Sequence, residues 1–444
     1  MNNTVIENTE LTSSFLSEQA EFASVYAEGP EWLRDLRKKG AEIFAELGIP
    51  SLKDEEWKYA PVSKHLNEEF SFSKAQVNCN ADDLQDQLLI TNVRSRIVLK
   101  NGTHCKELSS GVGSDSGIHV TVGIPEDRQK LLKKLLEDNN ELSSDTFLAL
   151  NTSFLKDLIF IHAEKNVIAE HAIEVVHMLG SGTENMMSFP RVIIYAEQGS
   201  KLRVVENFIS PANSKKGFHA AVTEIIEEQN ASAHHYMYQD VDEHTTLVTQ
   251  KYIRQQRDSR SDSFTLTLNG KFVRNNLRLS LLDTNAHAEL HGVYVPDGDQ
   301  LVDNHTLVDH VSPHCYSNEQ YKGVMGGRSE GVFNGKVFVR RDAQKTNAYQ
   351  SNNNILLTDD AQINTKPQLE IYADDVKCSH GATTGQLDEK ALFYLRSRGI
   401  GEAEARTLLV TAFMAEVINE IDDEDLREKF AQRTDAKLLR MSEH

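Results

Sequence analysis

The chain has 444 residues, and its 67 acidic against 47 basic residues give a formal net charge of -20. This length exceeds what one compact hydrophobic core serves, so two or three structural units are expected. The acidic excess argues against a nucleic-acid partner or an anionic membrane surface, and we therefore expect protein partners.

The cysteines and the apolar runs indicate a cytoplasmic chain. Four cysteines, at positions 79, 105, 315 and 378, are too few and too scattered for a disulfide framework, which favours a reducing compartment. The first residues, MNNTVIENTELTSS, lack a basic region followed by an apolar run. No stretch of about 18 apolar residues occurs either, so we predict no membrane segment.

Residues 1–92 have the character of a helical domain. Apolar side chains recur at helical spacing after Pro30, until Gly48 and Pro50 end the pattern. The stretch EEWKYAP follows at Glu55 to Pro61, with its two aromatic residues alternating as they would in an extended strand. Packing against the chain's own body is its simplest role, and docking to a partner is the alternative.

Residues 93–384 are predicted to form a strand-rich core. An αβ lead-in with a helix at 125–137 comes first, and short alternating strands rich in Val, Ile, Tyr and Thr dominate from Leu158. Turn positions recur in steps of 31, 28 and 27 residues, at Gly199, Asn230, Asp258 and Asn285. A drifting period of this size is typical of a solenoid.

The predicted fold class is mainly β, a parallel β-helix core flanked by N-terminal and C-terminal α-helical domains. A solenoid leaves unpaired backbone at both ends of its stack, so the terminal helices are expected to cap it. A large β-sandwich is the alternative, because short strands separated by frequent turns have the same pattern.

The stretch VKCSHGATTG, from residue 376, contains two soft metal ligands. Cys378 and His380 are two residues apart, so on a strand both side chains share one face. Two ligands are too few for a closed tetrahedral site, so the others would come from Asp374 and Asp375 or from a second chain. A packed thiol beside a hydrogen-bonded histidine is the plain alternative.

Residues 385–444 are predicted to be helical. The strand is expected to turn at Gly381 and Gly385, and a helix then runs from an N-cap at Asp388 to Gly399. Between residues 405 and 418 the apolar positions are wider than one core-facing stripe. This second helix either lies inside its own domain or binds a partner with its second face.

Other candidate ligands are weaker. One group contains several ligand types at a spacing that fits no standard zinc pattern: His305, Asp309, His310, His314 and Cys315. Four further histidines are still weaker candidates, because they fall on strand positions where stacked polar ladders are the simpler explanation: His234, His235, His287 and His291. No GxxxxGK[ST] phosphate loop is present, so no nucleotide is expected to bind directly.

Three stretches resemble the SufB/SufD family, the scaffold subunits of the SUF iron-sulfur cluster assembly machinery. They are EEWKYAP, the run from Asp309 to Val339, and CSHGATTGQLDEKALFYLRSRGI. The EEWKYAP stretch, the shorter length, and Gly381, where SufB has a Glu after its equivalent His, make the chain more similar to the SufD branch.

The resemblance implies a right-handed parallel β-helix and a scaffold that catalyses no reaction by itself. It implies pairing with a SufB-like paralogue, with a homodimer as the possible form in isolation. His380 first, and Cys378 second, would hold iron or a nascent cluster transiently at that interface. The resemblance also implies that the C-terminal helices dock a SufC-like ATPase, and the residues expected there are Leu392, Leu395, Leu408, Leu409, Ala412 and Phe413.

Two rival functions remain from the sequence. A β-helix polysaccharide lyase or hydrolase would use acidic and basic residues along a solenoid groove, but such enzymes are usually secreted. A structural adaptor would keep the docking surfaces and have no metal role.

Overall fold

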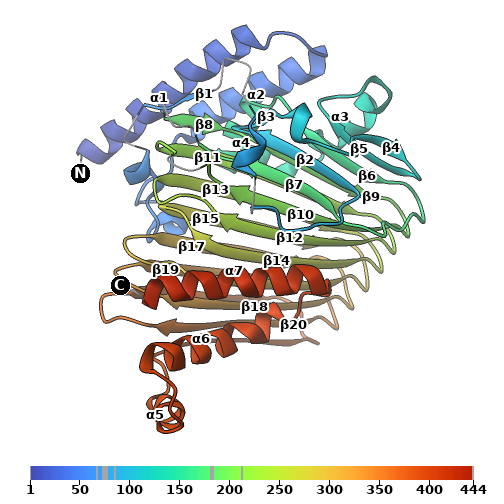
Figure 1. Ribbon diagram of the computed structural model, residues 1–444. Coiled ribbons are helices and arrows are strands. Elements are labelled where there is room, and N and C mark those ends of the chain that lie inside the picture. Colours follow the sequence, from blue (N-terminus) through green and yellow to red (C-terminus); the bar gives the residue numbers. More distant parts are fainter. Residues whose placement is uncertain are drawn as a thin grey trace.

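The computed structural model describes residues 2–66, 69–72, 79–84, 87–180, 185–211 and 214–442. Its body is a stack of coils (Figure 1). Along most of the stack, each coil contributes one strand to each of two sheets, so successive strands of the chain alternate between the sheets. From β6 and β7 onward, every pairing between successive coils is parallel. The prediction of a parallel β-helix with helices at both chain ends is therefore confirmed, and the β-sandwich alternative is wrong.

The N-terminal part consists of helices and short strands around the first coils. Its elements up to residue 83 are α1 (Asn2–Val25), α2 (Glu31–Leu47), η1 (Glu55–Trp57), η2 (Val62–His65), β1 (Ser71–Phe72) and η3 (Ala81–Asp83). The next are β2 (Ser95–Lys100), β3 (Thr103–His104), η4 (Lys106–Leu108), β4 (Gly113–Asp115), β5 (Ile118–Val122), η5 (Glu126–Arg128), α3 (Gln129–Glu137), η6 (Asn140–Ser143) and α4 (Thr146–Ser153).

The coils distribute their strands over two sheets. The larger sheet contains β1, β4, β5, β6 (Ile159–Ala163), β8 (Met186–Ser188), β9 (Arg191–Ala196), β11 (Gly217–Glu227), β13 (Thr245–Gln255), β15 (Phe272–Leu281), β17 (Leu301–His310), β19 (Glu330–Val339) and β21 (Gln362–Ile371). The smaller sheet contains β2, β3, β7 (Ile173–Met178), β10 (Lys201–Ile209), β12 (Ser232–Asp240), β14 (Arg260–Asn269), β16 (His287–Tyr294), β18 (Tyr316–Met325), β20 (Asn347–Leu356) and β22 (Lys377–Gly385).

The coil turns stack on residues with a left-handed backbone. The four predicted turn positions are confirmed, since Gly199, Asn230, Asp258 and Asn285 have φ values of 73°, 58°, 59° and 60°. The same conformation recurs at Asn166, His314 and Lys345. Each turn donates its backbone N–H to the next coil, as Asn230 does to the Arg257 carbonyl at 2.9 Å. Gly, Asn and Asp are the residues that adopt this conformation most readily.

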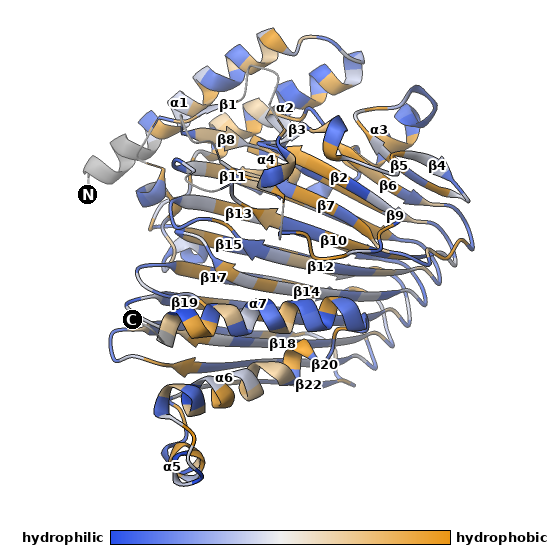
Figure 2. Ribbon diagram, viewed as in Figure 1, coloured by the Kyte–Doolittle hydropathy of each residue, from blue (hydrophilic) through white to orange (hydrophobic). Residues whose placement is uncertain are grey.

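The interior of the solenoid is apolar with buried polar networks. Figure 2 shows apolar and polar residues alternating along the strands, as expected when successive side chains face opposite sides. In one of these networks, the buried carboxylate of Glu206 lies 2.9 Å from His177 Nε2 and 2.8 Å from His235 Nε2, and accepts a hydrogen bond from Thr223. Burial favours a raised pKa for Glu206, but the hydrogen bonds from His177 and His235 outweigh it and lower the pKa.

The terminal helices cover opposite outer faces of the solenoid. Aromatic residues of α1, α2 and α4 share one core with β6, β11 and β15 of the larger sheet, for example Phe15, Phe44 and Phe218. The C-terminal helices are α5 (Glu389–Ser397), α6 (Glu402–Ile418) and α7 (Glu424–Ser442). Of these, α6 contacts β16 and β18, and α7 contacts β14, on the smaller sheet.

The prediction that helices cap both ends of the stack is wrong at the C-terminal end. There α6 and α7 lie flat on the smaller sheet, and α5 projects beyond it (Figure 1). Most residues of β22 are exposed, and among the strands of the described segments β22 pairs only with β20. The amphipathic helices bury their apolar faces on a sheet face, because a strand edge offers mainly polar backbone.

Several local predictions are also tested by the structure. The N-cap at Asp388 is confirmed, because its carboxylate accepts from the backbone N–H groups of Lys390 and Ala391. The turn predicted at Gly381 and Gly385 is wrong, because both residues lie in β22. The extended conformation predicted for EEWKYAP is wrong as well, since its first three residues form a 3-10 helix.

The cysteines were expected to be too few and too scattered for a disulfide framework, but two of them form one disulfide. Cys79 and Cys105 are bonded to each other, with their Cα atoms 5.9 Å apart. Cys105 is buried beside Val98 and Val176, in the small core under the start of the smaller sheet. Along the described chain, no helix has both the length and the apolar character needed to span a membrane.

We predict that replacing Glu206 with Ala destabilises the solenoid by about 3 kcal/mol or more, because three buried donors lose their acceptor. Urea unfolding followed by circular dichroism measures this change. Glu243→Ala, at a carboxylate that is 77% exposed, serves as the control and should leave the midpoint unchanged. Equal midpoints for the two variants would contradict the prediction.

Candidate functional site

The two soft ligands lie on the last strand of the smaller sheet. In the pairing of β22 with β20, Cys378 lies opposite Ala348 and His380 lies opposite Gln350. Ala348 and Gln350 are both buried. Cys378 and His380 therefore occupy interior-facing positions on one side of the strand, as the two-residue spacing predicts.

These positions are accessible because no further coil follows. His380 is exposed and Cys378 is partly buried. The last strand of the larger sheet, β21, continues the interior-facing positions of β19, and its residues there are Ile363, Thr365, Pro367, Leu369 and Ile371. Together the interior-facing residues of β21 and β22 form what we call the end face, a mixed apolar and polar surface containing the two ligands.

Cys378 has the surroundings of a packing residue rather than those of an activated thiol. It packs at the margin of the apolar core that contains Ala348 and Ala373. Burial raises the pKa of the Cys378 thiol, whereas reactive cysteines have a lowered pKa. Metal binding at Cys378 would have to displace a firmly held proton.

The chain by itself does not surround His380 with a set of metal ligands. Asp375 forms an ion pair with Lys345, and its backbone N–H bonds Gln344 at 3.0 Å. Within the described ranges, no group of three His, Cys, Asp or Glu ligand atoms includes His380 or Cys378. Of the two sources of further ligands considered from the sequence, this geometry favours the second chain.

A buried carboxyl group lies directly behind His380. Glu319, Gln350 and His380 are register neighbours on β18, β20 and β22. Glu319 is 1% exposed, and it accepts a hydrogen bond from Gln350 Nε2 at 2.6 Å. Burial raises the pKa of Glu319 to about 7. This column links the end face to the polar interior of the solenoid.

The helical residues expected to dock a partner fall into two groups. Leu392 is buried, and Leu409 and Phe413 pack against the core between the C-terminal helices and the smaller sheet. Lys322 holds Phe413 in two ways. Its Nζ lies 4.3 Å from the centre of the Phe413 ring, and it donates a hydrogen bond to the backbone carbonyl of Phe413. Leu395 is partly buried, whereas Leu408 and Ala412 are exposed.

The sequence analysis missed two prominent aromatic residues on α5. Phe393 is 75% exposed and Tyr394 is 57% exposed. Large apolar side chains this exposed on a projecting helix indicate a contact surface. The signal was the run ALFYL, in which five consecutive apolar or aromatic residues must place some of them outside any single buried face.

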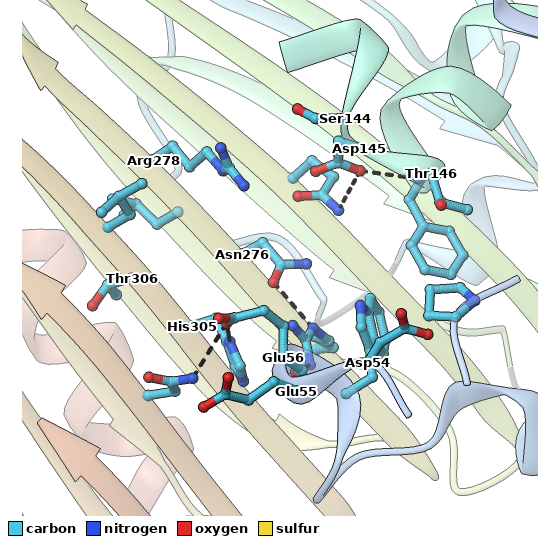
Figure 3. Close-up of a pocket in the computed structure, with 18 of the residues that line it drawn as sticks. Asp54, Glu55, Glu56, Ser144, Asp145, Thr146, Asn276, Arg278, His305 and Thr306 are labelled. Atoms are coloured by element: carbon cyan, nitrogen blue, oxygen red, sulfur yellow. Dashed lines mark hydrogen bonds and ion pairs between the residues drawn. The ribbon is translucent and has the colours of Figure 1, made fainter. Parts of the chain in front are cut away.

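The EEWKYAP stretch packs against the outer face of the larger sheet. Trp57 is buried, with the Arg274 guanidinium 3.6 Å from its ring centre, and Arg274 also bonds Asp303 at 2.6 Å. Glu56 and His305 lie 3.2 Å apart between their nearest charged atoms, beside a cleft of about 470 Å³ (Figure 3). The simpler of the two roles considered, packing against the chain's own body, is confirmed.

The second group of candidate ligands is dispersed by the fold. His305 faces outward to Glu56, and Asp309 pairs outside with Arg340 at 2.6 Å. His310 is buried in the interior, 2.8 Å from Ser317 Oγ. His314 occupies a coil turn, and the remaining member of the group is a buried cysteine. Strand alternation thus separates residues that are close in sequence, and no metal site forms from them.

Comparison with known proteins identifies both parts of the chain. Residues 9–175 match the family model described as "SufBD protein N-terminal region", and residues 178–413 match "SUF system FeS cluster assembly, SufBD core domain". The iron-sulfur cluster assembly protein SufD of Escherichia coli is 29% identical over 88% of this chain and 90% of its own length.

Two further relatives agree. An iron-sulfur cluster assembly SufBD family protein of Synechocystis is 29% identical over 89% of each chain. The iron-sulfur cluster assembly protein SufD of Bacillus subtilis is 26% identical over 92% of this chain and 94% of its own length. The two family models together cover the N-terminal helices from residue 9, the solenoid, α5 and the first part of α6.

We predict that Glu319 makes the protein less stable as the pH rises. Its folded-state pKa of about 7 lies above the usual value of about 4.3, so its contribution is complete below about pH 4.3 and is lost as the pH rises through about 7. Glu319→Gln should therefore show a smaller loss of stability between about pH 5 and about pH 8 than the wild type. Urea midpoints at both pH values measure it, and Glu243→Gln is the control. An unchanged pH dependence in Glu319→Gln would contradict this assignment.

Proposed function

Since the chain belongs to the SufBD family of iron-sulfur cluster assembly proteins, we propose that it is a scaffold subunit that pairs with a SufB-like paralogue through its end face. The observation that carries the proposal is the position of His380, a candidate metal ligand on a terminal strand with one free edge and with too few neighbouring ligands among the described residues. A partner that adds a strand there would also supply the missing ligands.

Strand addition is the mode of pairing that the end face supports best. The free edge of β22 carries unpaired backbone donors and acceptors, which a partner strand can bond. The other terminal strand, β21, contains Pro367, which has no backbone N–H to donate. The partner is therefore expected to pair along β22, which contains no proline and holds both ligands.

Iron or a nascent cluster is the cargo of this interface. The His380 imidazole would bind iron directly, while Cys378 would bind it only after losing the proton that burial stabilises. Gly381 follows His380 with open space around its Cα, so packing does not require a glycine there. The ligand set of this subunit is thus reduced to His380 and Cys378, and the partner would contribute the rest.

The C-terminal helices would bind a SufC-like ATPase. Their exposed apolar residues are Phe393, Tyr394 and Leu408, with Ala412 beside them. The helices are anchored to the smaller sheet through Lys322 and its contacts with Phe413 and Glu416. Movement of an attached ATPase would be transmitted to the solenoid through these contacts.

The proposal extends to the other properties that the sequence leads us to expect. The chain would catalyse no reaction by itself, would bind no nucleotide, nucleic acid or membrane, and would work in the cytoplasm. A homodimer through the same edge is its expected form when the paralogue is absent. The division into residues 1–92, 93–384 and 385–444 is supported by the end of β22 at Gly385.

The two rival functions lack comparable support. A polysaccharide-active enzyme would need an open groove with free acid and base groups, whereas Glu56 and His305 beside the cleft of Figure 3 bond each other. A structural adaptor without a metal role would have the same docking surfaces as the proposed scaffold. The two functions differ only in whether His380 binds iron.

We predict that His380→Ala leaves the complex with its SufB-like and SufC-like partners intact but lowers cluster formation several-fold, because one iron ligand is lost. Co-purification followed by anaerobic reconstitution, read by visible absorbance, measures both effects. His171→Ala, at another exposed histidine, is the matched control. A normal cluster yield in His380→Ala would leave the adaptor function as the better description.

We predict that Phe393→Asp weakens binding of the SufC-like ATPase at least about tenfold, because a charge enters an apolar contact, while the fold is unchanged. Calorimetric titration of the ATPase into each variant measures this. Ile168→Asp, at a solenoid residue that is 61% exposed, is the control. Unaltered affinity in Phe393→Asp would remove α5 from the docking surface.

A further inference from the structure

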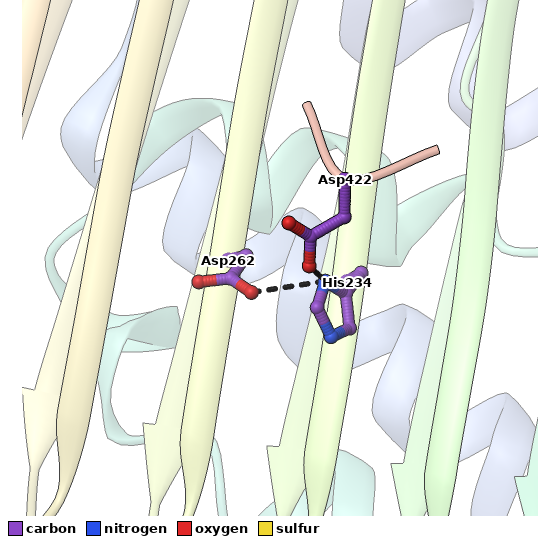
Figure 4. Close-up of side chains that lie close together, drawn as sticks. All are labelled: His234, Asp262 and Asp422. Atoms are coloured by element: carbon purple, nitrogen blue, oxygen red, sulfur yellow. Dashed lines mark ion pairs between the residues drawn. The ribbon is translucent and has the colours of Figure 1, made fainter. Parts of the chain in front are cut away.

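Three metal-ligating side chains meet on the outer face of the smaller sheet, away from the end face. His234 lies on β12, Asp262 on β14, and Asp422 in the turn between α6 and α7 (Figure 4). His234 Nδ1 is 2.9 Å from Asp262 Oδ2 and 3.8 Å from Asp422 Oδ2. One ligand atom from each residue lies within 4.8 Å of the other two, and no other such group of three occurs in the described residues.

The histidine presents its Nδ1 atom to the two carboxylates, and its Nε2 lies 3.4 Å from Ser232 Oγ. With the ring proton on Nε2, the Nδ1 lone pair faces the carboxylates, and this is the tautomer that binds a metal. Nδ1 is buried, and it has no hydrogen-bond partner of acceptable geometry despite the 2.9 Å approach of Asp262. In that tautomer a cation between Nδ1 and the carboxylates offsets the repulsion among their lone pairs, and in the metal-free protein a proton on Nδ1 does the same.

The spacing of the three groups suits one small cation. Two ligand atoms at about 2.0 Å from a tetrahedral zinc ion lie about 3.3 Å apart, and the two measured separations from Nδ1, 2.9 and 3.8 Å, bracket that value. Neither carboxylate is neutralised by an arginine or lysine ion pair among the described residues, since the adjacent Arg203 is paired with Asp423 at 2.6 Å.

We propose that His234, Asp262 and Asp422 form a binding site for a divalent transition-metal cation of the zinc type. One imidazole nitrogen and two carboxylate oxygens, with a coordination position left for water, are the ligands that such ions accept, whereas Mg²⁺ prefers oxygen ligands throughout. Asp422 is 70% exposed, so the ion can enter from solvent.

Occupancy of this site would fasten the C-terminal helices to the solenoid. The site joins two strands of the smaller sheet to the turn between α6 and α7, next to the ion pair of Arg203 with Asp423. A bound ion would add metal–ligand bonds across this junction. Because the ion would bind only when the helices are docked on the sheet, it would stabilise the docked position by mass action. The inference does not depend on the proposed assembly function.

The test is a Zn²⁺ titration of the full chain without a histidine tag, against a chromophoric chelator. Asp422→Asn removes one ligand, and Asp425→Asn makes the same charge change at an exposed helix residue outside the cluster. We expect Asp422→Asn to weaken Zn²⁺ binding at least about tenfold and Asp425→Asn to leave it unchanged. The same titration is repeated with both variants in a chain that also carries His380→Ala, which excludes Zn²⁺ binding at the end face.

Thermal unfolding gives a second readout. Zn²⁺ should raise the melting temperature of the wild type and of Asp425→Asn but not that of Asp422→Asn, and excess Mg²⁺ should not replace it. Equal Zn²⁺ affinities and equal melting shifts for the two variants would overturn the proposal. His234 and Asp262 would then form a simple ion pair beside an uninvolved Asp422.

Discussion

The structure depends on the pairing of each coil's backbone with its neighbouring coils. In a parallel solenoid every strand needs a strand on both sides, so the stack can be extended but cannot close on itself. At the N-terminal end, the short antiparallel strands β3, β4 and β5 extend the two sheets, and helices cover the adjacent outer face. At the C-terminal end β21 and β22 are left with one free edge each.

The candidate site is a consequence of this open end. Interior-facing residues such as Gln350 and Glu319 are buried because a further coil lies above them. His380 continues the same column, but the stack stops there and the imidazole becomes a surface group. A histidine that would be an ordinary interior residue one coil earlier is thereby exposed at the end of the stack.

The C-terminal helices leave the end face uncovered. Both α6 and α7 lie on the outer face of the smaller sheet, so the edge of β22 stays free. Contacts of Lys322 with Phe413, and of Arg203 with Asp423, join the helices to the sheet. The helix α5 extends past these anchors, which leaves Phe393 exposed.

The sequence by itself determined the features that local rules govern. The two-residue period of a strand places Cys378 and His380 on one face, left-handed turn residues mark the coils, and Asp388 begins a helix. Gly381 misled the prediction because glycine permits a turn without requiring one.

Only the tertiary structure decided which distant residues meet. Strand register places His305 and His310 on opposite faces of the larger sheet. The path of the chain brings Cys79 to Cys105 and Asp422 to His234. The same register fixes where the stack ends and therefore which ligand is exposed. A sequence pattern records the conformation of neighbouring residues, whereas these contacts depend on the summed path of the whole chain.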